Sequence, residues 1–204
     1  MKTKSCKVCK SDYTPQKMGQ KVCSPVCAIS LAISERGKAE KVAQVKDRRE
    51  TNAKLTAMKT RSQWMKEAKI AAQRARRLEE LAKGSGCISC GRSQEEVAGS
   101  DGWKPGGAWD GGHFLSKGAR PELALEPLNI WLQCKSCNAG SGKYARKGYT
   151  VNQSFRANLI DRIGLDAVEV MEADHAPRHY SIDEIKASIA SNNAKTKQLK
   201  ASQA

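Results

Sequence analysis

The sequence of 204 residues predicts an α+β protein in which a small, cysteine-bracketed core lies among helices. Three observations lead to this prediction. Eight cysteines fall into four close pairs, glycine and proline are dense from residue 99 to residue 118, and small or apolar residues recur at helical spacing elsewhere. Only 39% of the chain is hydrophobic and 5% is aromatic, so we expect no single large core. The predicted regions are residues 1–30, 31–83, 84–150 and 151–204.

The first region, residues 1–30, is predicted to be a small zinc ribbon or zinc knuckle. Its two cysteine pairs have the spacing of a structural tetrahedral zinc site and consist of Cys6, Cys9, Cys23 and Cys27. Few apolar residues are available here, so zinc would supply most of the folding free energy. Such modules bind DNA, bind protein or cap a neighbouring element, and the residues leave these roles open.

Residues 31–83 are predicted to form long basic helices. From Glu35 to Lys83 there are fifteen Lys and Arg against seven Asp and Glu, a local charge of +8. The first part is polar on all sides. It either lies along a phosphate backbone or a partner subunit, or is a solvated charged helix. From Ser62, a candidate N-cap, alanines recur at helical spacing, which indicates a face that packs closely on another element.

Residues 84–150 carry the features that indicate chemistry. Two further cysteine pairs, a second predicted structural zinc site, consist of Cys87, Cys90, Cys134 and Cys137. Between the pairs, Ala108–Leu115 is predicted to be a short strand that carries His113 near a bend, and 129–133 is an apolar run of strand type. A structural zinc site fixes the backbone but performs no reaction. The histidine held between the pairs is therefore the main catalytic candidate.

The C-terminal region, residues 151–204, is predicted to be helical. Apolar residues share a face up to Gly164, and Ser181 with Glu184 forms the sequence pattern of a capping box that opens a further helix. After Ser191 the chain is polar, and we expect that part to be frayed.

The charge and the cysteine content restrict the class of protein. The net charge is +15, from 36 Lys and Arg against 21 Asp and Glu, which favours a nucleic-acid partner over a merely soluble or ribosome-associated basic protein. The beginning of the sequence lacks the apolar stretch of a signal peptide, and no run reaches transmembrane length. We therefore expect a cytoplasmic protein without a membrane partner, whose cysteines are metal-bound thiolates rather than disulfides.

Three residues between and beside the cysteine pairs suit the hydrolysis of a phosphodiester. That reaction needs a base for the attacking water and a cation that stabilises the developing charge. His113 suits the base, and Asp110 and Asn138 offer oxygen atoms to a hard divalent ion. Alternatively, Asp110 is a turn or N-cap carboxylate, and His113 is a zinc ligand or a packed core residue. A basic cluster predicted to contact backbone phosphates consists of Lys135, Lys143, Arg146 and Lys147.

The order of these residues resembles that of the zinc-bracketed HNH (His-Me finger) endonucleases, among them junction-resolving phage enzymes. It resembles more specifically the NinG (Rap) recombination family of lambdoid phages, from about residue 6 to residue 190. The motifs that carry the resemblance are Cys23-Ser-Pro-x-Cys27, Arg61-Ser-x-Trp64, Cys87-Ile-Ser-Cys-Gly91, Trp109-Asp-x-Gly-His113, Asn129-Ile, Gln133-Cys-x2-Cys-Asn138 and Arg162-Ile-Gly164.

The resemblance implies a ββα-metal (HNH-like) core with two structural Zn²⁺ sites and a catalytic Mg²⁺ or Mn²⁺. His113 would be the general base, and Asn138 and Asp110 would be ligands of the catalytic ion. Asn129 would hold the hairpin loop through backbone hydrogen bonds. HNH enzymes usually place the first metal ligand directly before the base, and here that residue is Gly112. Asp110 would therefore have to reach the ion around a bend.

The implied function is a structure-specific DNA endonuclease of phage recombination, encoded by a phage or prophage and active in the bacterial cytoplasm. Its substrates would be branched DNA, namely D-loops and four-way Holliday junctions, recognised by shape and phosphates. A homodimer and contacts with phage recombination proteins are expected. Two alternatives stay open: a non-catalytic zinc adaptor that binds DNA or a recombinase, and an HNH nuclease that cuts linear duplex DNA.

Overall fold

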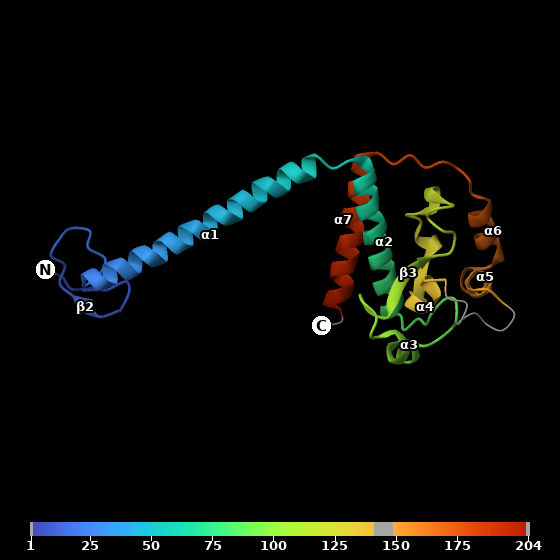
Figure 1. The fold of residues 1–204 in the computed structure, drawn as a ribbon, viewed down its shortest axis with the longest axis horizontal. Helices are drawn as coiled ribbons and strands as arrows, with labels where there is room; N and C mark the ends of the chain where they lie inside the picture. Colours follow the sequence, from blue (N-terminus) through green and yellow to red (C-terminus); the bar gives the residue numbers. More distant parts are fainter. Residues whose placement is uncertain (1, 141–148, 203–204) are drawn as a thin grey trace. The chain divides into compact units, whose positions relative to one another are not determined.

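The structure, a computed structural model, describes residues 2–140 and 149–202. The chain divides into two compact units, Met1–Lys59 and Thr60–Ala204, each of which is described by itself (Figure 1). Helices predominate, and two small antiparallel sheets of two strands each accompany them in the described part of the chain. The predicted mixture of helices and small sheets is therefore confirmed.

The first unit consists of a small loop-rich module followed by one long helix. Strands β1 (Lys4–Ser5) and β2 (Asp12–Tyr13) pair antiparallel, and helix α1 spans Pro25–Ala57. The Ser24 side chain caps α1 by accepting a hydrogen bond from the backbone N–H of Cys27, and Pro25 occupies the first turn, where no amide donor is needed. Helix α1 thus crosses the predicted boundary at residue 30 and begins within the cysteine module.

The second unit is organised around helix α2, Arg61–Ala82. The residue that caps α2 is Thr60, two positions before the predicted Ser62. The Thr60 hydroxyl accepts from the N–H of Gln63, whose side chain accepts in return from the N–H of Thr60. This capping box gives hydrogen-bond partners to two backbone N–H groups, which would be unsatisfied if the helix were capped at Ser62. The predicted small-residue face is buried and consists of Ala68, Ala71, Ala72 and Ala75.

A β-hairpin packs on α2 and carries the residues of interest. Strand β3 (Trp109–His113) pairs antiparallel with β4 (Ile130–Cys134), from Trp109 opposite Cys134 to His113 opposite Ile130. Gly111 permits the close approach to α2, because a Cβ atom there would lie 2.6 Å from the backbone oxygen of Gln73. The loop between the strands contains the short 3₁₀ turns η1 (Pro121–Leu123) and η2 (Pro127–Asn129).

The described residues of the second unit form five further helices. They are α3 (Gln94–Asp101), α4 (Lys135–Asn138), α5 (Val151–Ile163), α6 (Leu165–Ala173) and α7 (Ile182–Ala201). Helix α7 packs along α2, and α5 packs on α6 (Figure 1). The main apolar cluster joins the hairpin to α5 and α6 and consists of Ile88, Phe114, Leu123, Trp131, Phe155, Leu159, Val168 and Met171. A smaller cluster surrounds the second group of cysteines.

Helix α7 begins as predicted but ends ten residues later than expected. The capping box of Ser181 and Glu184 is formed, which confirms that prediction. The expectation of a frayed chain after Ser191 is wrong, because α7 continues to Ala201. Two contacts explain the extension: the Lys195 ammonium lies 2.6 Å from the Glu79 carboxylate of α2, and Thr196 is buried.

A buried carboxylate links three parts of the second unit. Glu80 of α2 is only 1% exposed. Its oxygens contact Arg76 at 3.1 Å, Lys83 at 3.2 Å and Arg162 of α5 at 3.0 Å. The guanidinium groups of Arg76 and Arg162 also lie over the ring of Trp131 in β4, 4.3 and 5.5 Å from its centre. The network therefore fixes α5 and the hairpin against α2.

Among the residues that the structure describes, no helix is both long enough and apolar enough to cross a lipid bilayer.

The Glu80 network yields a stability prediction. Replacing Glu80 by Ala leaves the partly buried cation of Arg162 without its counter-charge and leaves Arg76 with only one of its two carboxylate partners, Glu79. We expect a loss of about 3–5 kcal/mol in the free energy of unfolding, measured by urea denaturation of the zinc-loaded protein. The control is Asp161→Ala, an exposed carboxylate on α5, which should change stability by less than about 0.5 kcal/mol. Equal effects of the two substitutions would contradict a structural role for Glu80.

Candidate metal centres and active site

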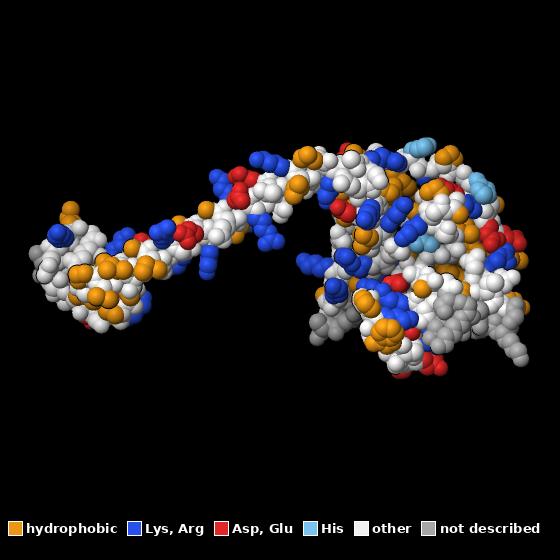
Figure 2. All heavy atoms as spheres, viewed as in Figure 1, with side chains coloured by type: hydrophobic (Ala, Val, Ile, Leu, Met, Phe, Trp, Pro, Cys, Tyr) orange, Lys and Arg blue, Asp and Glu red, His pale blue; other side chains and the backbone are white. Residues whose placement is uncertain are grey.

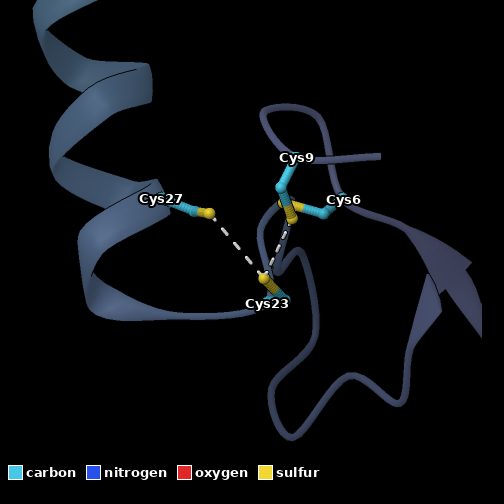
Figure 3. Close-up of side chains that lie close together, drawn as sticks. All are labelled: Cys6, Cys9, Cys23 and Cys27. Atoms are coloured by element: carbon cyan, nitrogen blue, oxygen red, sulfur yellow. Dashed lines mark hydrogen bonds between the residues drawn. The ribbon is translucent and has the colours of Figure 1, made fainter. Parts of the chain in front are cut away.

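Four thiols of the first unit converge on one point. The sulfur atoms of Cys6, Cys9, Cys23 and Cys27 all lie within 4.8 Å of one another (Figure 3). Cys9 and Cys23 are 3.5 Å apart, and Cys23 and Cys27 are 3.7 Å apart. Tetrahedral zinc with Zn–S bonds of about 2.3 Å requires sulfur atoms about 3.8 Å apart. The group therefore has the geometry to bind zinc, and Cys27 would tie the first turn of α1 to the metal.

The second group of thiols joins the hairpin to two other segments. Its members, Cys87, Cys90, Cys134 and Cys137, likewise lie within 4.8 Å of one another. Cys134 ends β4 and Cys137 lies on α4, so a shared zinc ion would fix α4 at the end of the hairpin. Hydrogen bonds with Cys134 lower the pKa of Cys90 and raise that of Cys137. Four thiolates at this spacing need a cation between them, which is the chemistry of a zinc site with four cysteine ligands.

The loop that begins at Cys87 requires one residue in the left-handed backbone conformation, with positive φ. The N–H of Cys87 donates to the carbonyl of Arg92 at 2.9 Å, and the N–H of Gly91 donates back to the carbonyl of Cys87 at 2.8 Å. Gly91 has a φ of +74°, a conformation that costs little for glycine alone. Glycine at this position therefore serves the shape of the metal loop.

The loop at Cys6 has the same hydrogen-bond pattern without the glycine. The N–H of Cys6 donates to the carbonyl of Ser11 at 2.9 Å, and the N–H of Lys10 donates to the carbonyl of Cys6 at 3.0 Å. Lys10 has a φ of 65° and is the one non-glycine residue with positive φ in the described chain. The first metal loop therefore carries backbone strain that the second avoids.

Arg92 balances the charge of the second thiol group. Its Nη2 atom lies 3.1 Å from the sulfur of Cys134, and its Nε atom lies 3.4 Å from the sulfur of Cys90. A guanidinium at this position offsets the negative charge that four thiolates and one Zn²⁺ leave behind. We did not predict this role from the sequence, where the one available signal is an arginine directly after the Cys-x2-Cys-Gly motif.

His113 ends β3 and is half-buried. Its Nε2 atom lies 3.1 Å from the carbonyl oxygen of Ala124, which can only accept a hydrogen bond. The ring proton therefore belongs on Nε2, and Nδ1 keeps a lone pair. Burial lowers the pKa of His113, the bond to Ala124 opposes this effect, and the charges of Lys117 and Lys69 lower the pKa further. The neutral ring can thus accept a proton near pH 7, and it belongs to neither group of metal-binding thiols.

The structure brings the two predicted oxygen donors together. Asn138, the last residue of α4, donates from Nδ2 to Oδ2 of Asp110 at 3.0 Å. Lys135 lies 3.5 Å from the other carboxylate oxygen of Asp110. This predicted phosphate-binding lysine is thus ion-paired within the site. The Asn138 amide keeps its oxygen, Oδ1, for another partner, because the nitrogen is the atom held by Asp110.

Two adjoining cavities place these side chains relative to one another. Asp110 lines a cavity of about 430 Å³, and His113 lines a second of about 440 Å³. Asn138 and Gln73 line both. Asp110 and His113 lie three residues apart on β3 and line different cavities. Asn138 is the predicted site residue that lines both the cavity of Asp110 and the cavity of His113.

Asn129 holds the loop between the hairpin strands. The side chain is completely buried; its oxygen accepts from the N–H of Leu115 at 2.7 Å. Its nitrogen donates to the carbonyls of Leu115 at 3.0 Å and Leu123 at 3.1 Å. All three bonds go to backbone groups. The contacts fix the loop that carries Ala124, the partner of His113.

The position of α4 depends on a buried acid that we did not predict. Asp101, the last residue of α3, accepts hydrogen bonds from the backbone N–H of Ser136 at 3.1 Å and from its hydroxyl. Lys104 lies 3.1 Å from the same carboxylate. Burial raises the pKa of Asp101, but the hydrogen bonds with Lys104 and Ser136 lower it by more, so the pKa is below its usual value. The glycine-rich surroundings of Asp101 in the sequence gave no signal for this contact.

The remaining residues of the predicted basic cluster, Lys143, Arg146 and Lys147, lie outside the described residues.

Comparisons with known proteins agree over nearly the whole chain. A family model described as "Bacteriophage Lambda NinG protein" matches residues 1–202. Protein ninG of Enterobacteria phage H19B is 34% identical over 208 residues, covering 97% of this chain and 94% of that protein. Protein ninG of Salmonella phage P22 is 33% identical over 203 residues, covering 94% and 90%, and that of Escherichia phage lambda has the same identity and coverage. No solved structure matches the chain.

The two thiol groups predict a metal content of two zinc ions per chain, measured by elemental analysis of the purified protein. Cys23→Ser should retain one zinc ion and leave the urea transition of the Thr60–Ala204 unit unchanged. Cys134→Ser should also retain one ion but abolish that transition, because zinc supplies folding free energy to the segments that it joins. Two ions in either variant would contradict the assignment.

The two metal loops predict opposite effects of glycine. Lys10→Gly should stabilise the first unit by about 1 kcal/mol, because it relieves the left-handed conformation. Gly91→Ala should destabilise the second unit by about 1–2 kcal/mol for the same reason. Chelator competition for zinc measures both effects. Gly118→Ala is the control, since Gly118 has no positive φ and open space around it. A loss of zinc affinity in Lys10→Gly would be inconsistent with strain at this position.

Proposed function

The chain belongs to the NinG family of bacteriophage proteins, and on that premise we propose that it is a divalent-metal-dependent endonuclease that cuts branched DNA. One observation carries the proposal. A neutral imidazole with an open ring nitrogen lines the same cavity as an amide that is held by a neighbouring carboxylate. This combination of a base and oxygen donors is what phosphodiester hydrolysis requires.

His113 is proposed as the general base. The carbonyl of Ala124 holds the Nε2 proton, so Nδ1 is the atom that would take a proton from the attacking water. The burial that lowers the pKa of His113 keeps this nitrogen unprotonated at neutral pH. Asn129 contributes indirectly, because its three backbone bonds fix the loop that contains Ala124.

Asn138 and Asp110 are proposed as the residues that would hold Mg²⁺ or Mn²⁺. Carboxylate and amide oxygens are the ligands that these hard cations prefer, and the two side chains are already in contact. Bound there, the cation would stabilise the charge on the phosphate and on the departing oxygen. Lys135 forms an ion pair with Asp110 in the structure. When the cation binds the Asp110 carboxylate, the Lys135 ammonium would become available to contact the phosphate backbone.

The arrangement of the elements supports an HNH-like ββα-metal core. A hairpin carries His113 at the end of its first strand, and a short helix that carries Asn138 follows the second. The second thiol group would join them through zinc. This is the order of elements that the resemblance to HNH endonucleases implies.

The charge of the site supports a nucleic-acid substrate. Arg74 and Arg77 line the cavity of Asp110, and Lys69 and Lys117 act electrostatically on His113. Lys and Arg side chains are spread over the viewed face of this unit (Figure 2). Such contacts recognise phosphates and the shape of DNA rather than its sequence. We also propose a homodimer, since a four-way junction needs two cuts, and action beside other phage recombination proteins in the bacterial cytoplasm.

Cleavage of a labelled four-way junction tests the proposal. In Mg²⁺ or Mn²⁺, the protein should cut the junction in preference to linear duplex DNA of the same sequence. His113→Ala should lower the single-turnover rate by about 10²–10⁴-fold and leave junction binding intact. His179→Ala, an exposed histidine near α7, is the control and should have no effect.

The pH profile of the same assay distinguishes a base from a structural residue. The rate should rise with pH and level off above a midpoint lower than that of an ordinary histidine, because the protonated ring cannot accept a proton and burial lowers the pKa of His113. Unchanged cleavage by His113→Ala would refute the assignment of the base. Binding without cleavage in every divalent ion would favour a non-catalytic zinc adaptor, and preferential cleavage of linear duplex would exclude the recombination substrate.

A further inference from the structure

Gly112 leaves room beside His113 that another side chain occupies. Gly112 directly precedes His113 on β3 and carries no side chain. A Cβ atom at Gly112 would overlap Oε1 of Gln133 and lie 3.0 Å from its Cδ atom. The carboxamide of Gln133 therefore takes the place that any side chain at position 112 would need. The space that Gly112 leaves is therefore filled by a polar side chain that lines the same cavity as the proposed base.

Gln133 is fixed in one orientation. It lies on β4 directly opposite Asp110, so the two side chains are on the same face of the hairpin. Its Nε2 atom donates to the hydroxyl of Ser89 at 2.8 Å, and the residue is 5% exposed. Within the described part of the chain, Oε1 accepts no hydrogen bond. The amide is thus held by its nitrogen, and the oxygen is left for another partner.

The neighbours of Gln133 are the proposed catalytic residues. Gln133 lines the cavity of about 440 Å³ together with His113 and Asn138. Asp110, opposite Gln133, holds the amide nitrogen of Asn138. Gln133 and Asn138 therefore resemble each other: each is an amide whose nitrogen donates to a protein group and whose oxygen accepts no hydrogen bond from the residues described.

We propose that Oε1 of Gln133 is a ligand of the catalytic cation, beside Asn138 and Asp110. The inference rests on the proposed function and identifies a further residue of the same site. A set of one carboxylate and two amides carries a single negative charge. It suits a hard divalent ion that keeps several waters, as Mg²⁺ and Mn²⁺ do. The pairing of Asp110 with Gln133 across the two strands would bring both side-chain oxygens to one face of the hairpin.

Binding of Mn²⁺ to the zinc-loaded protein tests the inference apart from cleavage. Free Mn²⁺ is titrated by electron paramagnetic resonance, in which zinc is silent. Gln133→Ala should weaken Mn²⁺ binding by roughly tenfold or more, because one oxygen ligand is lost. Gln133→Glu should tighten binding at least severalfold, because a charged oxygen replaces a neutral one near Asp110. Gln94→Ala is the matched control: Gln94 is also held by its amide nitrogen, which donates to Leu81 and Ser85, but it does not line this cavity.

The two substitutions separate a ligand from a packing residue. Two zinc ions and an unchanged urea transition establish that each variant is folded, and if Gln133→Ala fails this check, Gln133→Glu alone decides. Mn²⁺ affinity within twofold of the parent protein in a folded variant would overturn the inference. If the parent protein binds Mn²⁺ and cuts junctions while the Gln133 variants bind equally well, only the inference fails. If the parent protein neither binds Mn²⁺ nor cuts, the proposed function fails with it.

Discussion

The proposed catalytic site depends on the connection between the β3–β4 hairpin and helix α4. Cys134 and Cys137 are separated by only two residues, yet they belong to the strand and to the helix that follows it. A zinc ion held by these thiols would fix the angle between the two elements, and Asn138 is the next residue along the chain. Without that constraint, a four-residue helix has too few internal hydrogen bonds to keep its place. Asp101 adds a second support by capping α4 at Ser136.

The other half of the site is held by α2. Gly111 allows the hairpin to lie against the backbone of α2, and the side chain of Gln73 donates to the carbonyl of Gly111 at 2.8 Å. The Glu80 network then joins α2 to Trp131 and to α5 through two arginines. A polar network of this kind is costly when incomplete and rigid when satisfied. The Glu80 network therefore helps to hold the candidate site in place in a chain that has few aromatic residues.

The sequence predicted the features that depend on spacing along the chain, and not those that depend on distant contacts. Cysteine spacing predicted both groups of thiols, and the sequence pattern of Ser181 and Glu184 predicted the start of α7. The N-cap of α2 was missed by two residues because Thr60 forms a reciprocal box with Gln63. Helix α7 continues through a polar part of the sequence because Lys195 forms an ion pair with Glu79, which is 116 residues away in the chain. The same limit applies to the site, where Gln133 meets Gly112 only through strand pairing.

The central claim is that one cation and one neutral imidazole share the cavity beside Asn138. A crystal structure of the zinc-loaded protein soaked in Mn²⁺, with anomalous data that distinguish manganese from zinc, tests it most directly. We predict zinc at both groups of thiols and manganese coordinated by Oδ1 of Asn138, in the cavity that His113 lines. Manganese elsewhere on the protein, with none beside Asn138, would contradict the account.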